Sequence, residues 1–475
     1  MKNKLIIGFL IATVIANFGC KKQIDLKPTD NILPEIAFVT INDLQNTLNS
    51  AYARYDGEGT AYINSLLSDE VRLGRDNGGQ GQFANRFQYG QDATTGGDVT
   101  SGWLANYRMI FSCNLVLANL NKVPAPTSAD SLRVVRIGAQ ATALRALGFF
   151  ELQQRYAKGP YDPTSPGIPL TLTYVDPNTN PKPPRNTSLE VLNRIQADLT
   201  LASQQLPAIT TANFGDTLLN KLSITALQAR VALYKKEWQK AFDSSTAVIN
   251  SGIRPLATGT AFTGIWQDAV LNSEVLFRIK RNSASLGNLY TTTLNAVYFS
   301  PSVKLRSAYS AADIRPGAYF ATFNAALANN YVVFKFFQSS LGGRINDFKA
   351  IRISEMYLIR AEANVELTNL PNAGTADLDA LRSQRGLGLS STPLFATKAD
   401  AINFIFDERY RELCFEGFRF FDLKRKGFNV DRNLGAGDVE SAGWQSLVAG
   451  DYRFALPIPV AEIQANPNVT QNPNY

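Results

Sequence analysis

Residues 218–251 read LLNKLSITALQARVALYKKEWQKAFDSSTAVINS and carry the pattern of two amphipathic helices joined by a tight polar connection at Lys236-Glu237. Apolar residues recur at helical spacing along one stripe of the first helix: Leu222, Ala226, Ala229 and Leu233. The second helix repeats the pattern with Trp238, Ala241 and Val248. Because one helix pair cannot bury its apolar face alone, this stretch predicts a scaffold of stacked helix pairs.

Small alanines facing one large aromatic residue are typical of a tetratricopeptide helix hairpin. Similar arrangements occur at 139–156 and 353–367, without a strict 34-residue period, so the repeats are degenerate. Further helices are predicted at 41–52, 104–121, 133–156 and 187–205, and Thr187 to Glu190 has the spacing of a capping box. We therefore predict a mainly α fold with a tetratricopeptide-like scaffold over about 104–251 and 350–425, long irregular loops and a few short strands.

Two stretches interrupt the helical pattern. Between about 252 and 349, residues 274–281 and 331–337 are predicted as short strands among Gly, Ser, Asn and aromatic residues. Residues 77–102 are predicted as a long loop rich in Gly, Gln, Asn and Thr. Since loops on a rigid scaffold usually carry binding function, we expect these stretches to contain the ligand-binding residues.

The N-terminus has the pattern of an export signal. Lys2 and Lys4 precede an apolar stretch, residues 5–18, that is too short to span a bilayer as a helix. Gly19-Cys20 resembles the bacterial lipobox, in which the cysteine becomes the acylated first residue. We expect a signal peptide at 1–19, a lipid-anchored tether at 20–34 and a single domain over 35–475.

Composition excludes several classes of protein. The formal charge of +7 is spread over 475 residues and does not indicate a nucleic-acid surface. The chain has no histidine, which excludes Ser-His and Cys-His nucleophile pairs and His-containing metal sites. Cys113 and Cys414 lie in apolar helical patterns and are predicted to be buried, inert thiols. No cofactor and no metal are predicted.

Ordered motifs in the second half of the chain resemble those of the SusD/RagB family. They are RISEMYLIRAEA at 352–363, LRSQRG at 381–386, ERYRELCFEGFRFFDLKR at 408–425 and the ending LPIP…NPNVTQNPNY at 456–475. Earlier segments at 144–156, 159–161 and 167–170 agree with the family pattern. The resemblance is weakest at about 57–103 and 282–349, which we therefore expect to be the variable ligand-binding regions. The resemblance implies a SusD-like, all-helical fold and an outer-membrane lipoprotein on the cell surface. It also implies that the chain captures oligosaccharides or other nutrients for a SusC-like TonB-dependent transporter.

Three carboxylates, Glu408, Glu412 and Glu416, share one face of a predicted helix. A paired acid and base for glycoside hydrolysis is one interpretation of this spacing. The interpretation that we favour is an ion-pair network with nearby guanidinium groups, those of Arg409, Arg411, Arg419 and Arg425. We therefore do not expect an enzyme.

Glycan recognition requires flat aromatic faces together with planar polar groups. The first variable region supplies Arg75, Asp76, Asn77, Gln82, Phe83, Asn85, Phe87 and Tyr89, and the second supplies Tyr290, Tyr298 and Tyr309. Phe83, Phe87 and Tyr89 are candidates for a stacking platform, and a local mini-core that stabilises the loop is the alternative. Trp103 and Trp266 are predicted to be core residues.

The leading hypothesis is a lipoprotein that binds a glycan or other nutrient, touches the membrane through its lipid anchor at Cys20 and works with a SusC-like transporter. The alternative is a helical-repeat adaptor lipoprotein that binds a protein partner without touching nutrient. A lipid-anchored hydrolase is disfavoured because no credible acid and base pair is present.

Overall fold

The computed structural model describes residues 38–90, 94, 97–174, 182–269, 273–283, 286–291, 296–322, 331–337, 340, 344–432 and 444–475. The predicted signal peptide (1–19), Cys20 and the tether (20–34) lie outside the described residues and stay predictions. Among the residues described, every helix falls short of the length and apolarity that a membrane span requires.

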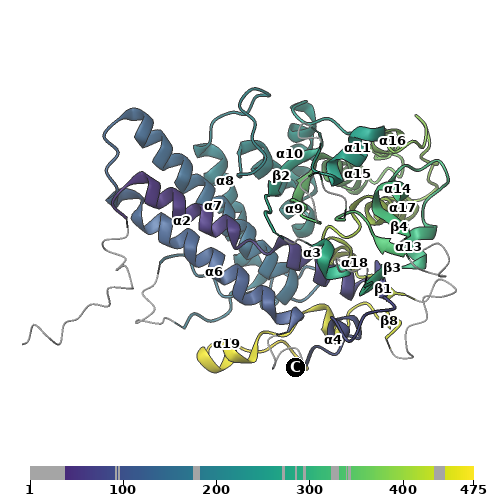
Figure 1. Ribbon diagram of the computed structural model, residues 1–475, viewed down its shortest axis with the longest axis horizontal. Helices are drawn as coiled ribbons and strands as arrows, with labels where there is room; N and C mark the ends of the chain where they lie inside the picture. The colour runs from purple at the N-terminus through teal and green to yellow at the C-terminus, as the bar shows by residue number, and fades with distance from the viewer. Residues whose placement is uncertain are drawn as a thin grey trace, which may run out of the picture.

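A row of long helices forms one half of the molecule, with α2, α6 and α7 lying side by side at its end (Figure 1). Neighbours in the chain pack on one another from α6 through α10, and α10 then packs on α15. Their bounds are α2 Ile41–Ala53, α6 Asp98–Asn119, α7 Ser128–Tyr156, α8 Ser188–Gln205, α9 Lys221–Lys235, α10 Trp238–Asn250 and α15 Ile353–Thr368. The stacked helix pairs predicted from 218–251 are thus confirmed.

Local signals in the sequence set the ends of these helices. At the start of α8 the Thr187 backbone N–H donates to Glu190 Oε2 at 2.8 Å, and the Glu190 N–H donates to Thr187 Oγ1 at 3.3 Å. This reciprocal pair is the predicted capping box. Helix α9 ends at Lys236, whose left-handed backbone (φ 60°) turns the chain directly into α10.

In the other half, the described residues form shorter helices and four two-stranded antiparallel sheets. The helices are α3 Gly57–Leu67, α4 Gln82–Asn85, η2 Leu120–Lys122, α11 Gly259–Trp266, α12 Gly287–Tyr290, α13 Val303–Ser307, α14 Arg315–Tyr319, α16 Thr375–Ser383, α17 Lys398–Leu413, α18 Arg419–Lys426, η3 Tyr452–Phe454 and α19 Val460–Ala465. The sheets pair β1 Val71–Leu73 with β3 Phe299–Pro301, β2 Val275–Ile279 with β6 Phe348–Arg352, β4 Phe320–Thr322 with β5 Tyr331–Val333, and β7 Val430–Asp431 with β8 Ser446–Leu447.

Several predicted elements differ from those of the structure. Helix α3 lies inside the predicted variable region 57–103, and most of its residues are buried. The assignment of that region to ligand binding stays a prediction. The predicted loop 77–102 contains α4, and α6 already begins at Asp98. Strand β2 falls within the predicted 274–281, whereas only the first three residues of the predicted strand 331–337 pair, as β5. Isolated Gly and Asn residues suggested loop where tertiary packing favours short helices.

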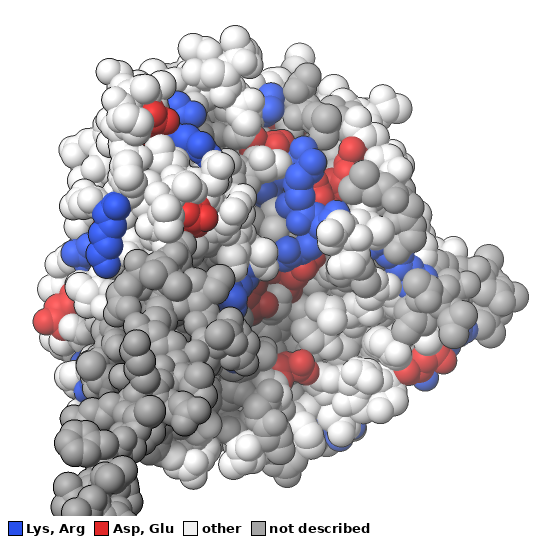
Figure 2. Space-filling view, turned by 60° about the vertical axis from the view of Figure 1, so that its left-hand side comes forward, with Lys and Arg blue, Asp and Glu red and all other residues white. Residues whose placement is uncertain are grey.

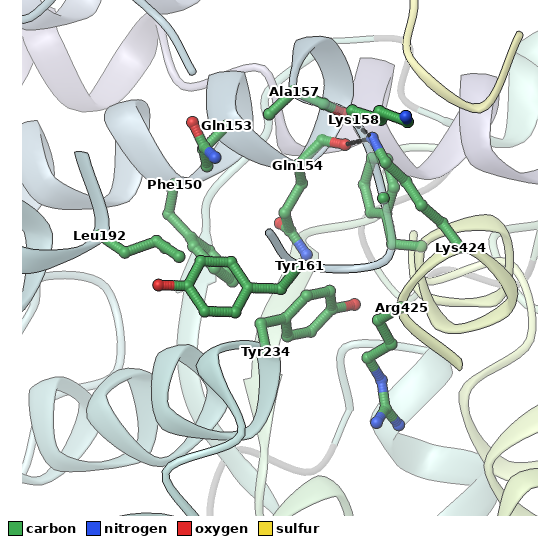
Figure 3. A pocket seen from close by; sticks show the side chains of 12 residues that line it. Phe150, Gln153, Gln154, Ala157, Lys158, Tyr161, Leu192, Tyr234, Lys424 and Arg425 are labelled. Atoms are coloured by element: carbon green, nitrogen blue, oxygen red, sulfur yellow. Dashed lines mark hydrogen bonds between the residues drawn. The ribbon is translucent and has the colours of Figure 1, made fainter. Parts of the chain in front are cut away.

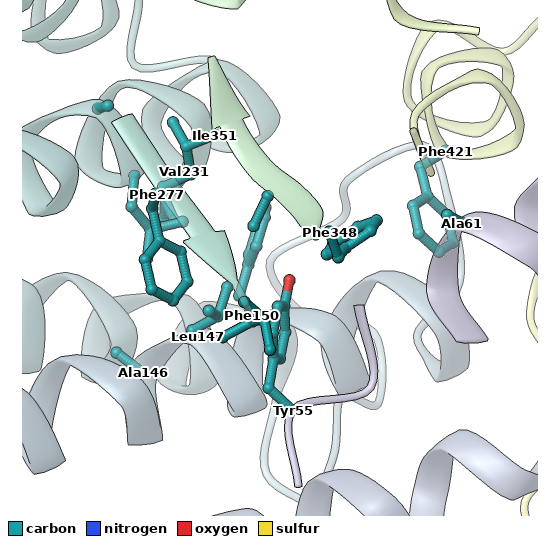
Figure 4. Packing of buried hydrophobic residues seen from close by; sticks show 14 of the residues in the cluster. Tyr55, Ala61, Ala146, Leu147, Phe150, Val231, Phe277, Phe348, Ile351 and Phe421 are labelled. Carbon is teal, nitrogen blue, oxygen red and sulfur yellow. The ribbon is translucent and has the colours of Figure 1, made fainter. Parts of the chain in front are cut away.

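A hydrophobic core joins the two halves where the β2–β6 pair lies over α7 and α9 (Figure 4). The ring of Tyr55 lies 6.5 Å from that of Phe277 on β2 and 6.3 Å from that of Phe348 on β6. Trp103 and Trp266 are buried, as predicted. Cys113 and Cys414 are also buried, and burial raises the pKa of each thiol to about 12, so both are inert near neutral pH.

A buried ion-pair network surrounds the carboxylates of α17. Glu412 accepts from Arg352 at 3.0 Å, from Arg385 at 2.9 Å and from Arg315 at 3.3 Å. Glu408 pairs with Arg315 at 2.7 Å and Glu416 pairs with Arg352 at 2.7 Å. The structural interpretation of these carboxylates is therefore confirmed.

Most of the predicted partners in that network were wrong. Of the four guanidinium groups expected, Arg411 alone pairs with one of the three carboxylates, Glu408. Arg409 binds Asp422, Arg419 binds Asp69, and Arg425 binds Glu362 and Asp422. Spacing along a helix identifies neighbours on the same helix, whereas the main partners here come from distant segments of the chain.

We predict that replacing Arg385 with methionine lowers the free energy of unfolding by about 3–5 kcal/mol. Glu274 and Glu412 then remain buried but lose the guanidinium group that pairs with both of them. Urea denaturation followed by circular dichroism measures this loss. Lys240→Gln is the matched control, since the exposed Lys240–Glu237 pair contributes less than about 1 kcal/mol. Equal losses in the two variants would contradict the structural role of the network.

Candidate ligand-binding surface

The two variable regions predicted from the sequence meet at one place in the structure. Strand β1 pairs with β3 so that Leu73 lies opposite Phe299, although the two are far apart in the chain. Beyond the strands, the Gly74 N–H donates to Tyr298 O at 2.8 Å and the Asp76 N–H donates to Val297 O at 3.0 Å. The loop after β1 and the segment before β3 thus form a single surface.

Glycine is required where these two segments cross. A Cβ atom on Gly74 would lie 2.2 Å from the carbonyl oxygen of Val297, which is backbone and cannot swing aside. The close approach of Gly74 therefore fixes how the loop that follows β1 lies against the segment before β3.

Arg75 and Asp76 stand at the exposed edge of this junction. Their side chains are 47% and 37% exposed and form an ion pair of 2.8 Å. The Asp76 carboxylate also accepts the Val297 N–H at 2.9 Å. Hydrogen bonds from Arg75 and then from Val297 lower the pKa of Asp76. The pair therefore presents an oriented guanidinium and an ionised carboxylate to solvent.

Tyr298 and Phe83 are half-buried and keep part of each ring at the surface. Asn77 is buried and structural, because its Nδ2 donates to Gln80 O at 2.9 Å and Tyr298 O at 3.0 Å. Asn85 is fully buried and donates to Leu66 O at 3.3 Å. Arg75, Asp76, Phe83 and Tyr298 thus keep side chains that a ligand could reach, and the two asparagines hold the loop.

Phe87, Tyr89 and Tyr290 are buried, so they do not form a surface platform. Phe87 lies beneath the Arg432 guanidinium at 4.3 Å and meets Tyr89 edge-on at 6.3 Å. The Tyr290 hydroxyl bonds Ser65 Oγ at 3.1 Å inside the core. Phe87 and Tyr89 thus belong to a local mini-core, the alternative to a stacking platform, and Tyr290 is a core residue.

Aromatic residues of 331–337 extend the surface, although this segment was predicted only as a strand. Strand β5 lies against β3, and the Tyr331 ring lies 3.7 Å below the Arg306 guanidinium. Phe334 and Phe337 stack at 5.5 Å, with the Arg344 guanidinium 4.1 Å from the Phe337 ring. Tyr331, Phe334 and Phe337 are half-buried, and two buried residues separate each from the next. This spacing differs from the two-residue period of a strand, so strand periodicity does not identify them.

Two neighbouring carboxyl groups beneath this surface differ in charge state. Burial opposes ionisation of Asp69, but Arg419 at 2.7 Å and Lys304 at 2.7 Å hold its pKa well below the usual range. Glu70 has no cation within ion-pair distance among the described residues, and it accepts from Ser65 Oγ and the Phe415 N–H. Burial raises its pKa to about 7.

Within the described part of the chain, no three acidic or cysteine side chains gather in a way that could hold a metal ion. Figure 2 shows one face of the molecule, where most of the surface is uncharged and basic side chains along a hollow have acidic ones beside them. The β1–β3 surface combines aromatic faces with guanidinium, carboxylate and backbone hydrogen-bonding groups.

A helical-repeat scaffold that presents such loops defines a class of binding protein, and comparisons with known proteins identify its family. Residues 314–475 match the SusD family, and residues 24–233 match a family described as starch-binding and associating with the outer membrane. The two matches leave only residues 1–23 and 234–313 uncovered. The chain belongs to the SusD/RagB family.

Relatives resemble the chain over most of its length. SusD-like protein P2 of Formosa agariphila is 25% identical over 530 aligned residues that span all of both chains. A SusD superfamily protein of Bacteroides thetaiotaomicron is 25% identical, with a TM-score of 0.80 over 92% of this chain and 100% of the other. A laminarin-binding SusD-like protein shares the fold at 21% identity, with a TM-score of 0.69 over 92% of this chain and 100% of its own.

We predict that Glu70 makes the protein less stable as the pH rises from 4.5 to 7. The unfolded chain releases this proton near pH 4.5 and the folded chain near pH 7, so deprotonation between these values favours unfolding. The unfolding free energy of Glu70→Gln minus that of the wild type should therefore be about 3 kcal/mol larger at pH 8 than at pH 5.

The measurement is urea denaturation of the wild type and of Glu70→Gln at both pH values. Other titrating groups cancel in the difference between the two proteins. A difference in unfolding free energy that stays constant from pH 5 to pH 8 would rule out the raised pKa of Glu70.

Proposed function

We propose that this chain captures a glycan on the surface formed by residues 74–76, Phe83, Tyr298 and 331–337, and delivers it to a SusC-like TonB-dependent transporter. The observation that carries the proposal is the meeting of the two variable regions through β1 and β3. That junction places the Arg75–Asp76 pair beside Tyr298, with β5 packed next to it.

The chemistry of this surface suits sugars. Partly exposed rings such as Tyr298 and Tyr331 offer apolar faces for the C–H surface of a pyranose. Arg75 and Asp76 offer a planar donor and a charged acceptor for neighbouring hydroxyl groups. A relative whose structure resembles this chain is named for laminarin binding, and one matching family is described as starch-binding, which supports a glycan as the ligand.

Binding without catalysis agrees with the state of the α17 carboxylates. Glycoside hydrolysis requires one carboxyl group that keeps a proton near neutral pH. Burial alone would raise the pKa of Glu408, but Arg315, Arg411 and Arg382 lower it to about 2. Arg385 and Arg352 likewise hold the pKa of Glu412 well below its usual range. Both groups are fully buried, so neither can protonate a glycosidic oxygen.

Delivery to a transporter and anchoring through Cys20 complete the proposal. The family description places related proteins at the outer membrane, and the motif at Gly19-Cys20 supplies an acylation site. Hydrogen bonds at an exposed surface compete with water and contribute modestly, so the ligand is held weakly enough to be released to the transporter.

We predict that Tyr298→Ala and Arg75→Ala each weaken glycan binding about tenfold, which corresponds to about 1.4 kcal/mol of lost stacking or hydrogen bonding. Isothermal titration calorimetry against laminarin, starch and other oligosaccharides first identifies a ligand of the wild type and then measures its dissociation constant in each variant.

Phe111→Ala is the matched control, since Phe111 is an exposed aromatic residue on α6 in the helical half. It should leave the dissociation constant unchanged. A ligand whose affinity is insensitive to Tyr298 and Arg75 but falls in Phe111→Ala would place the site elsewhere. Failure of the wild type to bind any glycan, together with a stable complex with another protein, would favour the adaptor function instead.

A further inference from the structure

A hollow lies between the C-terminal end of α7, helix α9 and helix α18 (Figure 3), and it shares no lining residue with the β1–β3 surface. Its volume is about 50 Å³, and its lining includes Gln154, Lys158, Tyr161, Tyr234 and Lys424. A second hollow of about 310 Å³ is lined by Lys236, Trp238, Glu366 and Lys426, among others. Tyr234 and Arg425 line both, so the two hollows adjoin. We call them together the α9–α18 groove.

Two polar groups in the groove have no hydrogen-bond partner in the described part of the chain. The Tyr234 hydroxyl is buried, and no described residue hydrogen-bonds it. Buried tyrosine hydroxyls usually find a partner. The Gln154 side-chain amide likewise has no partner within the described residues, and Figure 3 shows it reaching toward the Tyr161 ring. Donors and acceptors are therefore available beside three aromatic rings, those of Tyr161, Tyr234 and Trp238.

Positive charge exceeds negative charge along the groove. Lys424 is buried, and its Nζ donates to Gln154 O at 2.7 Å and to Ala157 O, two carbonyls at the end of α7 (Figure 3). These bonds use two of its three donors, and no described carboxylate lies within ion-pair distance. Burial without such a partner lowers the pKa of Lys424 to about 7. An anion placed here would favour the charged form.

Two further cations stand at the rim. Lys158 and Lys236 are exposed, and neither forms an ion pair with a described residue. Arg425 is already paired with Glu362 and Asp422. Among the described residues that line the groove, Glu366 supplies the single carboxylate, which binds Lys398 at 2.7 Å and Lys426 at 3.4 Å. Lys158, Lys236 and Lys424 can therefore pair with an anionic ligand, and little negative charge in the groove competes with it.

We propose that the α9–α18 groove binds an acidic sugar unit, a uronate or a sulfated pyranose, as a second site on this protein. The smaller hollow has room for a few water-sized groups, which suits a carboxylate or sulfate between Lys158 and Lys424. The larger hollow takes the ring against Tyr234 and Trp238. The inference rests on the proposed glycan-binding function and names an acidic glycan as the ligand class for this groove.

The test compares ligands that differ only in the acidic group. Glucuronate, glucose 6-sulfate and glucose are titrated into the full mature chain by calorimetry and by tryptophan fluorescence. Trp103 and Trp266 are buried, Trp444 is half-buried and does not line the groove, and Trp238 lies in the groove wall. A fluorescence change that disappears in Trp238→Phe therefore locates the ligand. Response to glucuronate but not to the sulfate identifies the carboxylate as the preferred group, and the reverse identifies the sulfate.

We expect one of the two acidic sugars to saturate with a dissociation constant of about 1 mM and glucose to bind at least about tenfold more weakly. The variant Lys158→Gln/Lys236→Gln should weaken the acidic sugar about tenfold, and the loss should shrink at high salt. Lys122→Gln, an exposed lysine in η2, is the matched control and should change nothing.

Three results would overturn the inference: equal affinity for glucose and the acidic sugars, no saturation by either acidic sugar, or unchanged affinity in the double lysine variant. None of these three results bears on the proposal that the β1–β3 surface binds glycan. Loss of binding in Tyr298→Ala tests that surface separately, so the two proposals fail independently.

Discussion

The fold depends on the buried charges around Glu412. Three guanidinium groups from separate segments, those of Arg315, Arg352 and Arg385, converge on this one carboxylate. Taking such ions out of water costs several kcal/mol each, so the folded protein is stable only when every buried charge has an oppositely charged partner in good geometry. That requirement fixes α14, β6 and the segment after α16 relative to α17, and it gives the irregular half of the molecule a defined arrangement beside the helical repeats.

A fixed arrangement of this half is what brings the variable regions together. Arg315 and Arg352 flank the residues between about 315 and 352, so the segment containing β5 is held at both ends. Tyr410 and Arg419 from the same C-terminal region bind Asp69, directly before β1. The loop surface at Arg75 and Tyr298 is therefore carried on a rigid base, as a site that must recognise a ligand without reorganising requires.

Much of the scaffold could be predicted from the sequence, and the site could be predicted only in part. Helical spacing at 218–251 and the capping box at Thr187 depend on local chemistry, which a sequence displays directly. The partners of Glu412 and the burial of Phe87, Tyr89 and Tyr290 depend on long-range packing, which it does not. Tyr331, Phe334 and Phe337 were missed because a short aromatic run fits a strand as well as a binding loop.

Hydrogen–deuterium exchange with a bound neutral oligosaccharide tests the central claim most directly, namely that ligand is held on the β1–β3 surface while the α17 carboxylates only hold the fold. The account predicts slower exchange on binding in peptides covering 74–83, 296–302 and 331–337, with α17 equally protected in the free and bound states. Protection confined to α17 or to the long helices α6 and α7, with no change at the β1–β3 surface, would contradict it.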